Sequence, residues 1–248
     1  MRKITSITMA MVLGLAGALG AGTAQASVIV FQTPMGATTS GGAVSATASF
    51  TLSANTLDIQ LTNTLANPTS VAQLLSGLSF TLDSGLTNGT LSSSVANFIT
   101  VASGGTFSSA GSGLPTGWVL QPGFDLCDIC ASGGGSNRPA GLIIGPPGAG
   151  HLYSSANGSI AGNGPHNPFI DQTASYDLNI QGLSASDAIS SVTFRFGTTF
   201  GTDTVDGVCT SDCGGTSVPE PGPLALFAAG LLGCALFINR RRRASRQR

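Results

Sequence analysis

Residues 44–62 read VSATASFTLSANTLDIQLT, and this stretch predicts the fold more directly than any other part of the chain. Apolar and polar residues alternate strictly in its two halves. Alternation with a period of two is typical of a β-strand that has one buried face and one solvated face. Ala54 and Asn55, between the halves, leave room only for a tight turn. We therefore expect a β-hairpin here.

Other segments show the same alternation or a short apolar run. Further strands are expected over residues 28–31, 78–82, 118–121, 142–144, 176–180 and 192–196. Asn88-Gly89 is a strong signal for a second hairpin. Residues 103–117 and 132–168 are rich in glycine and serine and do not fit strands. The fold class that follows is an all-β domain, an antiparallel β-sandwich of jelly-roll-like type.

Charge is sparse and unevenly placed along the chain. Charged residues make up 8% of the sequence, and most of the basic ones lie at its two ends. Between Ser27 and Ser217 there are ten aspartates, two arginines and no lysine, a net charge of −8. Binding to nucleic acid depends on lysine and arginine that neutralise phosphates, so no nucleic-acid partner is expected. A surface solvated by hydroxyl and amide groups is expected instead, as in extracellular β-proteins.

The first 26 residues have the pattern of a secretory signal peptide. Arg2 and Lys3 form a positive start, and residues 9–19 are apolar. Ala24-Gln25-Ala26 then supplies the small residues that a signal peptidase site requires. We expect export and a mature chain that begins at Ser27.

The last 31 residues, 218–248, contain three elements in order. Residues 218–222 read VPEPG, residues 223–239 are largely apolar, and residues 240–248 are basic. The apolar segment is long enough to predict one transmembrane helix. Because arginines stay on the cytoplasmic side, the four at Arg240, Arg241, Arg242 and Arg243 act as a membrane stop and place the rest of the chain outside.

Over Val218 to Arg248 this tail resembles the PEP-CTERM sorting domain, which is carried by substrates of exosortases. The resemblance implies that Pro219, Glu220 and Pro221 are the recognition motif and that the helix and arginines retain the chain in the inner membrane lipid. It further implies an exosortase-like processing partner and a setting in an exopolysaccharide or biofilm layer. Pro223 stands where such tails often have threonine or serine.

The chain therefore divides into a signal peptide (1–26), a β-sandwich ectodomain (27–200), a stalk (201–217) and the sorting tail (218–248). Four cysteines lie in the exported part, at Cys127, Cys130, Cys209 and Cys213. Because an exported chain meets an oxidising compartment, disulfides are expected. Zinc or a redox role remains an alternative, and the three possible pairings stay open.

Few residues suggest catalysis or cofactor binding. His151 and His166 do not have the spacing of a metal pair, and the aspartates near the cysteines are read as solvated loop carboxylates rather than a calcium site. No phosphate loop and no nucleophile elbow occur, so no catalytic residue, metal or cofactor is expected. Four aromatic residues are candidates for a sugar-binding face: Trp118, Tyr153, Tyr176 and Phe169. Trp118 is expected in the core, whereas Tyr153 is the better surface candidate.

These observations favour a non-enzymatic surface or matrix protein that is exported, tethered by its tail and sorted by an exosortase. A carbohydrate-binding or adhesive module that contacts extracellular polysaccharide is one alternative. A secreted hydrolase is the other.

Overall fold

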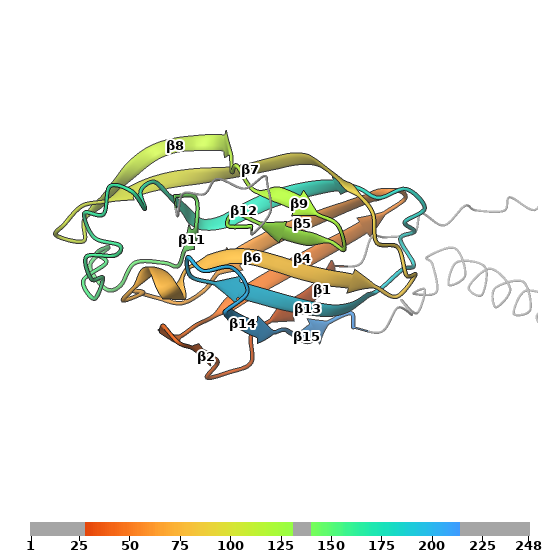
Figure 1. Cartoon of the computed structure of the whole chain (residues 1–248), viewed down its shortest axis with the longest axis horizontal. Helices are drawn as coiled ribbons and strands as arrows, with labels where there is room; N and C mark the ends of the chain where they lie inside the picture. The colour runs from red at the N-terminus through yellow and green to blue at the C-terminus, as the bar shows by residue number, and fades with distance from the viewer. Residues whose placement is uncertain (1–27, 131–139, 214–248) are drawn as a thin grey trace, which may run out of the picture. The chain divides into compact units, whose positions relative to one another are not determined.

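Strands make up about half of the described chain, which in this computed structural model comprises residues 28–130 and 140–213 (Figure 1). The elements are β1 (Val28–Gln32), β2 (Thr38–Thr39), β3 (Gly42–Ala43), β4 (Ala46–Ser53), β5 (Thr56–Asn63), the 3₁₀ helix η1 (Val71–Gln73), β6 (Leu75–Leu82), β7 (Thr90–Val101), β8 (Phe107–Pro115), β9 (Val119–Gln121), β10 (Asp125–Cys127), β11 (Ile143–Ile144), β12 (Phe169–Asn179), β13 (Ile189–Phe196), β14 (Asp203–Asp206) and β15 (Val208–Ser211).

Thirteen of these strands belong to one hydrogen-bonded sheet. Its main path runs β14-β13-β6-β11-β12-β5-β4-β1-β15, with β7 and β8 continuing from β12, and β10 and β9 from β6. The short strands β2 and β3 pair only with each other. Every pairing is antiparallel except that of β11 with β12. The all-β prediction is therefore confirmed.

The hairpin expected from residues 44–62 is β4 and β5. Ser53 lies opposite Thr56, and the pairing continues without a shift to Ala46 opposite Asn63. Asn55 takes the left-handed conformation that the tight turn requires (φ 62°), which asparagine tolerates better than most residues. Burial alternates along both strands as the sequence predicts.

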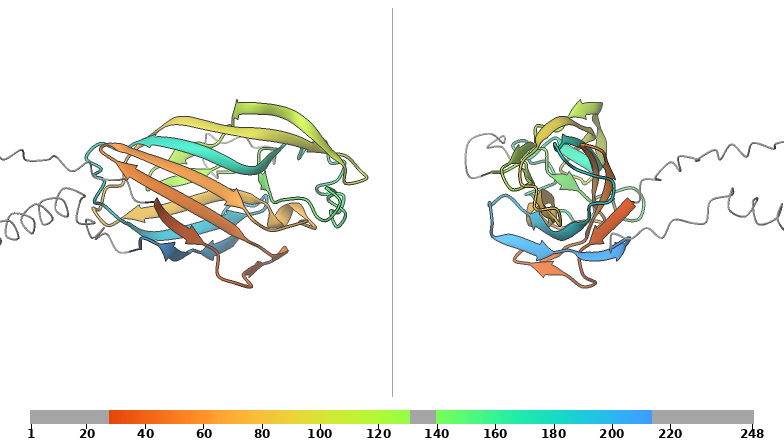
Figure 2. Two further views of the ribbon diagram at one scale, coloured as in Figure 1. Left: turned by 180° about the vertical axis from the view of Figure 1, so that it is seen from behind. Right: turned by 90° about the vertical axis from the view of Figure 1, so that its right-hand side faces the viewer.

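The sheet curves so that strands far apart in its hydrogen-bonding order share one core (Figure 2). The rings of Phe50 on β4 and Phe80 on β6 are 5.4 Å apart between centroids, although these strands are not hydrogen-bonded neighbours. Phe124 stacks on Phe80, with the two ring centroids 5.0 Å apart. Burial of these rings removes apolar surface from water and so contributes to the driving force for folding.

The hairpin expected at Asn88-Gly89 is wrong. The strands on either side, β6 and β7, do not pair with each other, and residues 83–89 instead connect two different parts of the sheet. A side chain at Gly89 would lie 3.0 Å from Ile180 Cγ1 and 3.1 Å from the Asn179 carbonyl oxygen. Gly89 therefore lets the backbone pass close to the end of β12, and it does not form a hairpin turn.

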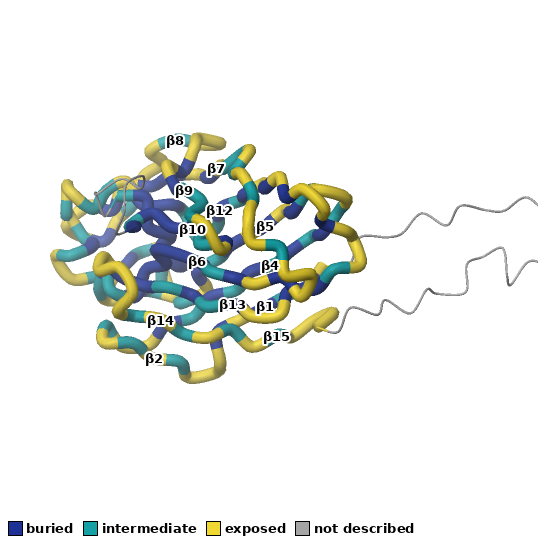
Figure 3. The backbone as a smooth tube through the Cα atoms, turned by 45° about the vertical axis from the view of Figure 1, so that its right-hand side comes forward, coloured by how far each residue is buried: buried dark blue, intermediate teal, exposed yellow. Residues whose placement is uncertain are grey.

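The loop expected over residues 103–117 is largely a strand. β8 occupies residues 107–115 and pairs with β7. Most of its residues are exposed on both faces, as the tube coloured by burial shows (Figure 3). A strand with no buried face has no reason to alternate apolar and polar residues, which explains why its sequence resembles a loop.

Part of the expected stalk is also in the sheet. β14 pairs with β13 and β15 pairs with β1, so residues 203–211 belong to the folded domain. Gly207 stands between the two strands, and its N–H donates to the Val192 carbonyl oxygen at 2.8 Å. An added Cβ at Gly207 would lie 3.0 Å from the Phe194 ring, so the absence of a side chain allows the backbone to run close to this ring between β14 and β15.

Within residues 28–130 and 140–213, no helix has the length and apolar character needed to cross a membrane. The expected signal peptide (1–26) and transmembrane helix (223–239) both lie outside the described residues.

Candidate functional site

The residues expected to direct sorting lie outside the described part of the chain. These are Pro219, Glu220 and Pro221 of the motif and Arg240 to Arg243 of the membrane stop. The four cysteines lie within it, and the structure places them in two separate local groups.

Cys127 and Cys130 form the first disulfide, with their Cα atoms 5.9 Å apart. Both residues are buried. Cys127 ends β10, where it lies opposite Gly77 of β6. This pairing supports the disulfide interpretation of the sequence over zinc, since a structural zinc site needs four ligands held together.

Cys209 and Cys213 form the second disulfide, with a Cα–Cα distance of 5.7 Å. Cys209 lies on β15 opposite Phe31 of β1, and Cys213 is exposed at the end of the described chain. Four cysteines can pair in three alternative ways, and the structure has the one in which both disulfides are local. No disulfide ties the last strands to β10.

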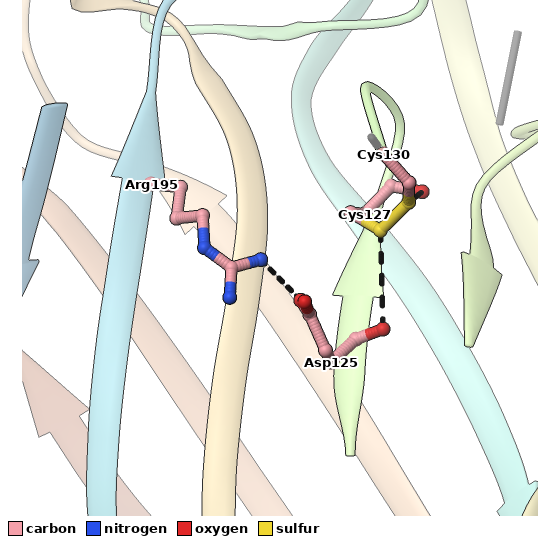
Figure 4. Close-up of a disulfide and its surroundings, with 4 residues drawn as sticks. All are labelled: Asp125, Cys127, Cys130 and Arg195. Carbon is pink, nitrogen blue, oxygen red and sulfur yellow. Dashed lines mark hydrogen bonds and ion pairs between the residues drawn. A yellow bond between two sulfur atoms is a disulfide. The ribbon is translucent and has the colours of Figure 1, made fainter. Parts of the chain in front are cut away.

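An ion pair lies beside the first disulfide. The guanidinium group of Arg195 on β13 contacts the carboxylate of Asp125 on β10 (Figure 4). These strands are not neighbours, because β6 lies between them. Gly77 of β6 lies opposite Arg195, and an added Cβ there would be 3.4 Å from the arginine Nη1. The missing side chain of Gly77 gives the guanidinium group room to cross β6.

Phe200 completes this group of residues. The central carbon of the Arg195 guanidinium lies 5.1 Å from the centroid of the Phe200 ring, the geometry of a cation–π contact. Arg195 and Asp125 are mostly buried, with side-chain exposures of 15% and 18%. Because Arg195 on β13 pairs with Asp125 on β10 and lies over the Phe200 ring, this arrangement is suited to joining strands.

Asp128 lies between the two cysteines and is fully buried. Its backbone N–H donates to the Ser76 carbonyl oxygen at 3.0 Å. Nearby, burial and then the negative charge of Asp128 raise the pKa of Tyr176 well above its ordinary value. The Tyr176 ring is also in contact with Trp118, whose indole N–H donates to the Gly141 carbonyl oxygen at 2.9 Å. The phenol is therefore kept neutral inside the domain.

The four aromatic candidates for sugar binding are all buried. Trp118 is in the core, as expected, and Tyr176 and Phe169 are fully buried. The expectation for Tyr153 is wrong: only 1% of its surface is exposed, and its hydroxyl donates to the Gly145 carbonyl oxygen at 3.0 Å. The glycine-rich segment around Tyr153 folds back over a small apolar cluster, which also contains Phe169. None of the four can stack on a sugar in this conformation.

The aspartates near the chain end make individual contacts. Asp203 accepts hydrogen bonds from the N–H and Oγ of Ser40, at 3.0 and 2.9 Å, and Asp206 accepts one from Thr193 at 2.9 Å. Of the histidines, His151 is exposed and His166 contacts the Ser159 carbonyl oxygen through Nδ1. Over the described ranges, no three histidine, cysteine or acidic side chains lie close enough to hold a metal ion together.

The sequence did not predict the link between Asp125 and Arg195, which join β10 and β13 across β6. One signal was available. Arg195 is the only lysine or arginine in residues 28–130 and 140–213, and a single cation on an alternating strand needs a partner if it is to be buried. The identity of that partner depended on the order of strands in the sheet.

Comparison with known proteins adds one finding. A family model of the PEP-CTERM protein-sorting motif matches residues 217–243. The recognition of this motif from the sequence is thereby confirmed. No curated protein and no solved structure matches the chain.

Proposed function

Starting from the PEP-CTERM motif at residues 217–243, we propose that this chain is a structural component of a cell-surface or extracellular layer, exported and then sorted through its tail. The motif carries the proposal because it implies export and recognition by an exosortase. In this proposal the residues from Ser27 onward form a sandwich-like ectodomain without catalytic activity. The exopolysaccharide or biofilm setting and the membrane-spanning tail helix are part of the same proposal.

The contacts of the polar side chains support a structural role. Asp125 and Arg195 are paired with each other, and Asp203 is engaged by Ser40. Two local disulfides suit a domain that is exposed to an oxidising compartment. The second of them closes the last strand of the domain at Cys213, shortly before the matched motif begins at residue 217. With the last strand closed in this way, a processing enzyme can act on the segment after Cys213 while the domain stays folded.

Intact-mass measurement and terminal-peptide mapping of the protein from its native cells test the proposal. We expect a chain that begins at Ser27 and ends near Val218 to Pro221. The variant Glu220→Ala should retain the tail, because it removes the one charged group of the recognition motif. Thr216→Ala, just outside the matched residues, is the matched control and should be processed like the natural chain.

Two results would contradict the sorting part of the proposal. One is a native chain that still carries residues 224–248, which would indicate a simple membrane anchor. The other is equal processing of the Glu220→Ala and Thr216→Ala variants.

A further inference from the structure

The two disulfides of the described domain differ in how easily a reagent can reach them. Cys213 is exposed and Cys209 is half-buried, whereas Cys130 is 8% exposed and Cys127 is fully buried. Thiol–disulfide exchange begins when a thiolate attacks a disulfide sulfur, so its rate depends on access to that sulfur. A small thiol can therefore approach the second disulfide in the folded domain, while the first is reached only when the domain opens.

The two halves of the second disulfide are not equivalent. Cys209 lies on β15 opposite Phe31 of β1, and it packs against the main apolar core. Cys213 lies beyond Ser211, where β15 ends, and is more exposed than Cys209. An attacking thiolate therefore has better access to the Cys213 sulfur, and the Cys209 sulfur is then the one that leaves.

The charge beside Cys213 favours some thiols over others. Asp212 is the neighbouring residue and is exposed. Arg195 is the only lysine or arginine in residues 28–130 and 140–213, and it is paired with Asp125. The carboxylate of Asp212 therefore repels an anionic thiol and attracts a cationic one. Through water, one such charge changes the rate of attack by about threefold in each direction.

We propose that the Cys209–Cys213 disulfide is a reversible exchange site for small thiols, which prefers cationic thiols to anionic ones. The thiolate of the small molecule attacks Cys213 Sγ, and a mixed disulfide forms there. The bond between the two cysteine sulfurs breaks, and its electron pair leaves with Cys209 Sγ, which takes a proton from water. This inference concerns the folded domain and does not depend on how the tail is processed.

The exchange is reversible because Cys209 stays close to the adduct. Only four residues separate it from Cys213. Its thiolate can attack Cys213 Sγ, expel the small thiol and restore the original disulfide. Alternatively, a second small thiol attacks the small-molecule sulfur of the adduct. That step releases a small-molecule disulfide and leaves both cysteines reduced, so two thiols are oxidised for each protein disulfide that is reduced.

The first test treats the full chain, in a neutral detergent at low salt, with cysteamine as the cationic thiol. Free cysteines are then alkylated, and peptide mapping locates every label, including any on Cys234. We expect cysteamine on Cys213 and the alkyl group on Cys209. Cys127 and Cys130 should react at least about tenfold more slowly, because their buried disulfide must first become exposed. In urea this difference should disappear, since the two disulfides close loops of nearly equal length.

The second test measures the preference for charge. The rate for each thiol with the Asp212→Asn variant is divided by its rate with the natural chain, which cancels the intrinsic reactivity of the thiol. This ratio should be about three for mercaptopropionate, an anion, and about one third for cysteamine. Salt at 1 M should bring both ratios close to one. Asp177→Asn is the matched control, because β5, β4 and β1 separate its strand from β15 in the sheet, and it should change either rate less than about twofold.

Four results would overturn the proposal. The first is opening of both disulfides at equal rates in the folded chain. The second is the absence of any exchange until urea unfolds the domain. The third is an adduct on Cys209 in place of Cys213. The fourth is an equal effect of the Asp212→Asn and Asp177→Asn substitutions on the two thiols, which would remove the preference for charge.

Discussion

The two disulfides span almost the same length of chain but lie in different surroundings. Cys127 and Cys130 are three residues apart and buried, beside the ion pair that crosses β6. Cys209 and Cys213 are four residues apart at the exposed end of the last strand. The chemical bond and the loop that it closes are nearly equal in the two cases. If removing one disulfide lowers the free energy of unfolding more than removing the other, the difference therefore reflects the surroundings and not the bond itself.

The two disulfides therefore have different structural roles. The first disulfide fixes the end of β10 at the place where Asp125 meets Arg195, so it lies within the packing that joins β6, β10 and β13. The second fixes the end of β15 before the chain continues to the sorting motif. One is expected to contribute to the stability of the whole domain, and the other to hold the end of the last strand in place.

The largest effect is expected from removing the first disulfide. The double variant Cys127→Ser, Cys130→Ser should lower the free energy of unfolding by about 3 kcal/mol, of which about 2 kcal/mol is the entropy of the closed loop and about 1 kcal/mol is the burial of new hydroxyl groups. The double variant Cys209→Ser, Cys213→Ser should lose about 2 kcal/mol, because its hydroxyl groups can reach water. Urea unfolding of both variants measures the difference. Equal losses would contradict the distinction between the two environments.

A smaller effect is expected from breaking the ion pair next to the first disulfide. Arg195→Met keeps much of the side-chain volume but leaves the mostly buried carboxylate of Asp125 without its cation. We expect a loss of about 2 kcal/mol, less than for a fully buried pair because the site is partly hydrated. The double variant with Asp125→Asn should recover about 1 kcal/mol of this loss in a double-mutant cycle. Strict additivity of the two substitutions would show that the pair contributes no coupling energy.

The smallest effect is expected at a carboxylate pair that involves neither disulfide. Asp58 on β5 lies opposite Asp177 on β12, and both side chains are exposed. Burial, then the charge of Asp177 and a hydrogen bond with it, raise the pKa of Asp58 above its ordinary value of 3.8. A raised folded-state pKa means that ionised Asp58 disfavours the folded state, so its contribution to stability improves as the pH falls.

Asp58→Asn should therefore stabilise the domain at pH 7 by about 0.5 kcal/mol at low salt, the usual size of a cross-strand charge effect. The gain should decrease as the pH falls through the raised pKa and disappear below 3.8. Thermal unfolding at a series of pH values measures it, and 1 M salt should remove the part that comes from the charge of Asp177 by screening. A gain that is independent of pH would show that the ionised carboxylate of Asp58 is not its cause.

The sequence predicted those features that depend only on residues close together in the chain. Strict alternation over residues 44–62 predicted the β4–β5 hairpin, because a strand with one buried face must alternate. The order of elements in residues 218–248 was enough to recognise the sorting motif, which the family model matches at 217–243. Disulfides could be expected from the exported setting, although their pairing could not.

The sequence failed where a residue's role depends on what lies beside it. β8 is exposed on both faces, and no residue of β14 or β15 is buried, so their sequences lack the alternation that a buried face imposes. Asn88-Gly89 has the composition of a hairpin turn, yet its flanking strands find other partners. Tyr153 lies in a glycine-rich segment that folds back over a second apolar cluster, and this return is not encoded near the tyrosine itself.

Local pattern thus determined that this chain is an all-β protein with a PEP-CTERM motif near its end. The tertiary structure decided which strands are edges, which cysteines pair and which acid meets Arg195. The physical reason is that hydrophobic alternation records only whether one face of a strand is buried. The neighbours of a strand are set by packing among segments far apart in the sequence, such as Phe50 with Phe80 across the core and Arg195 with Asp125 over Gly77.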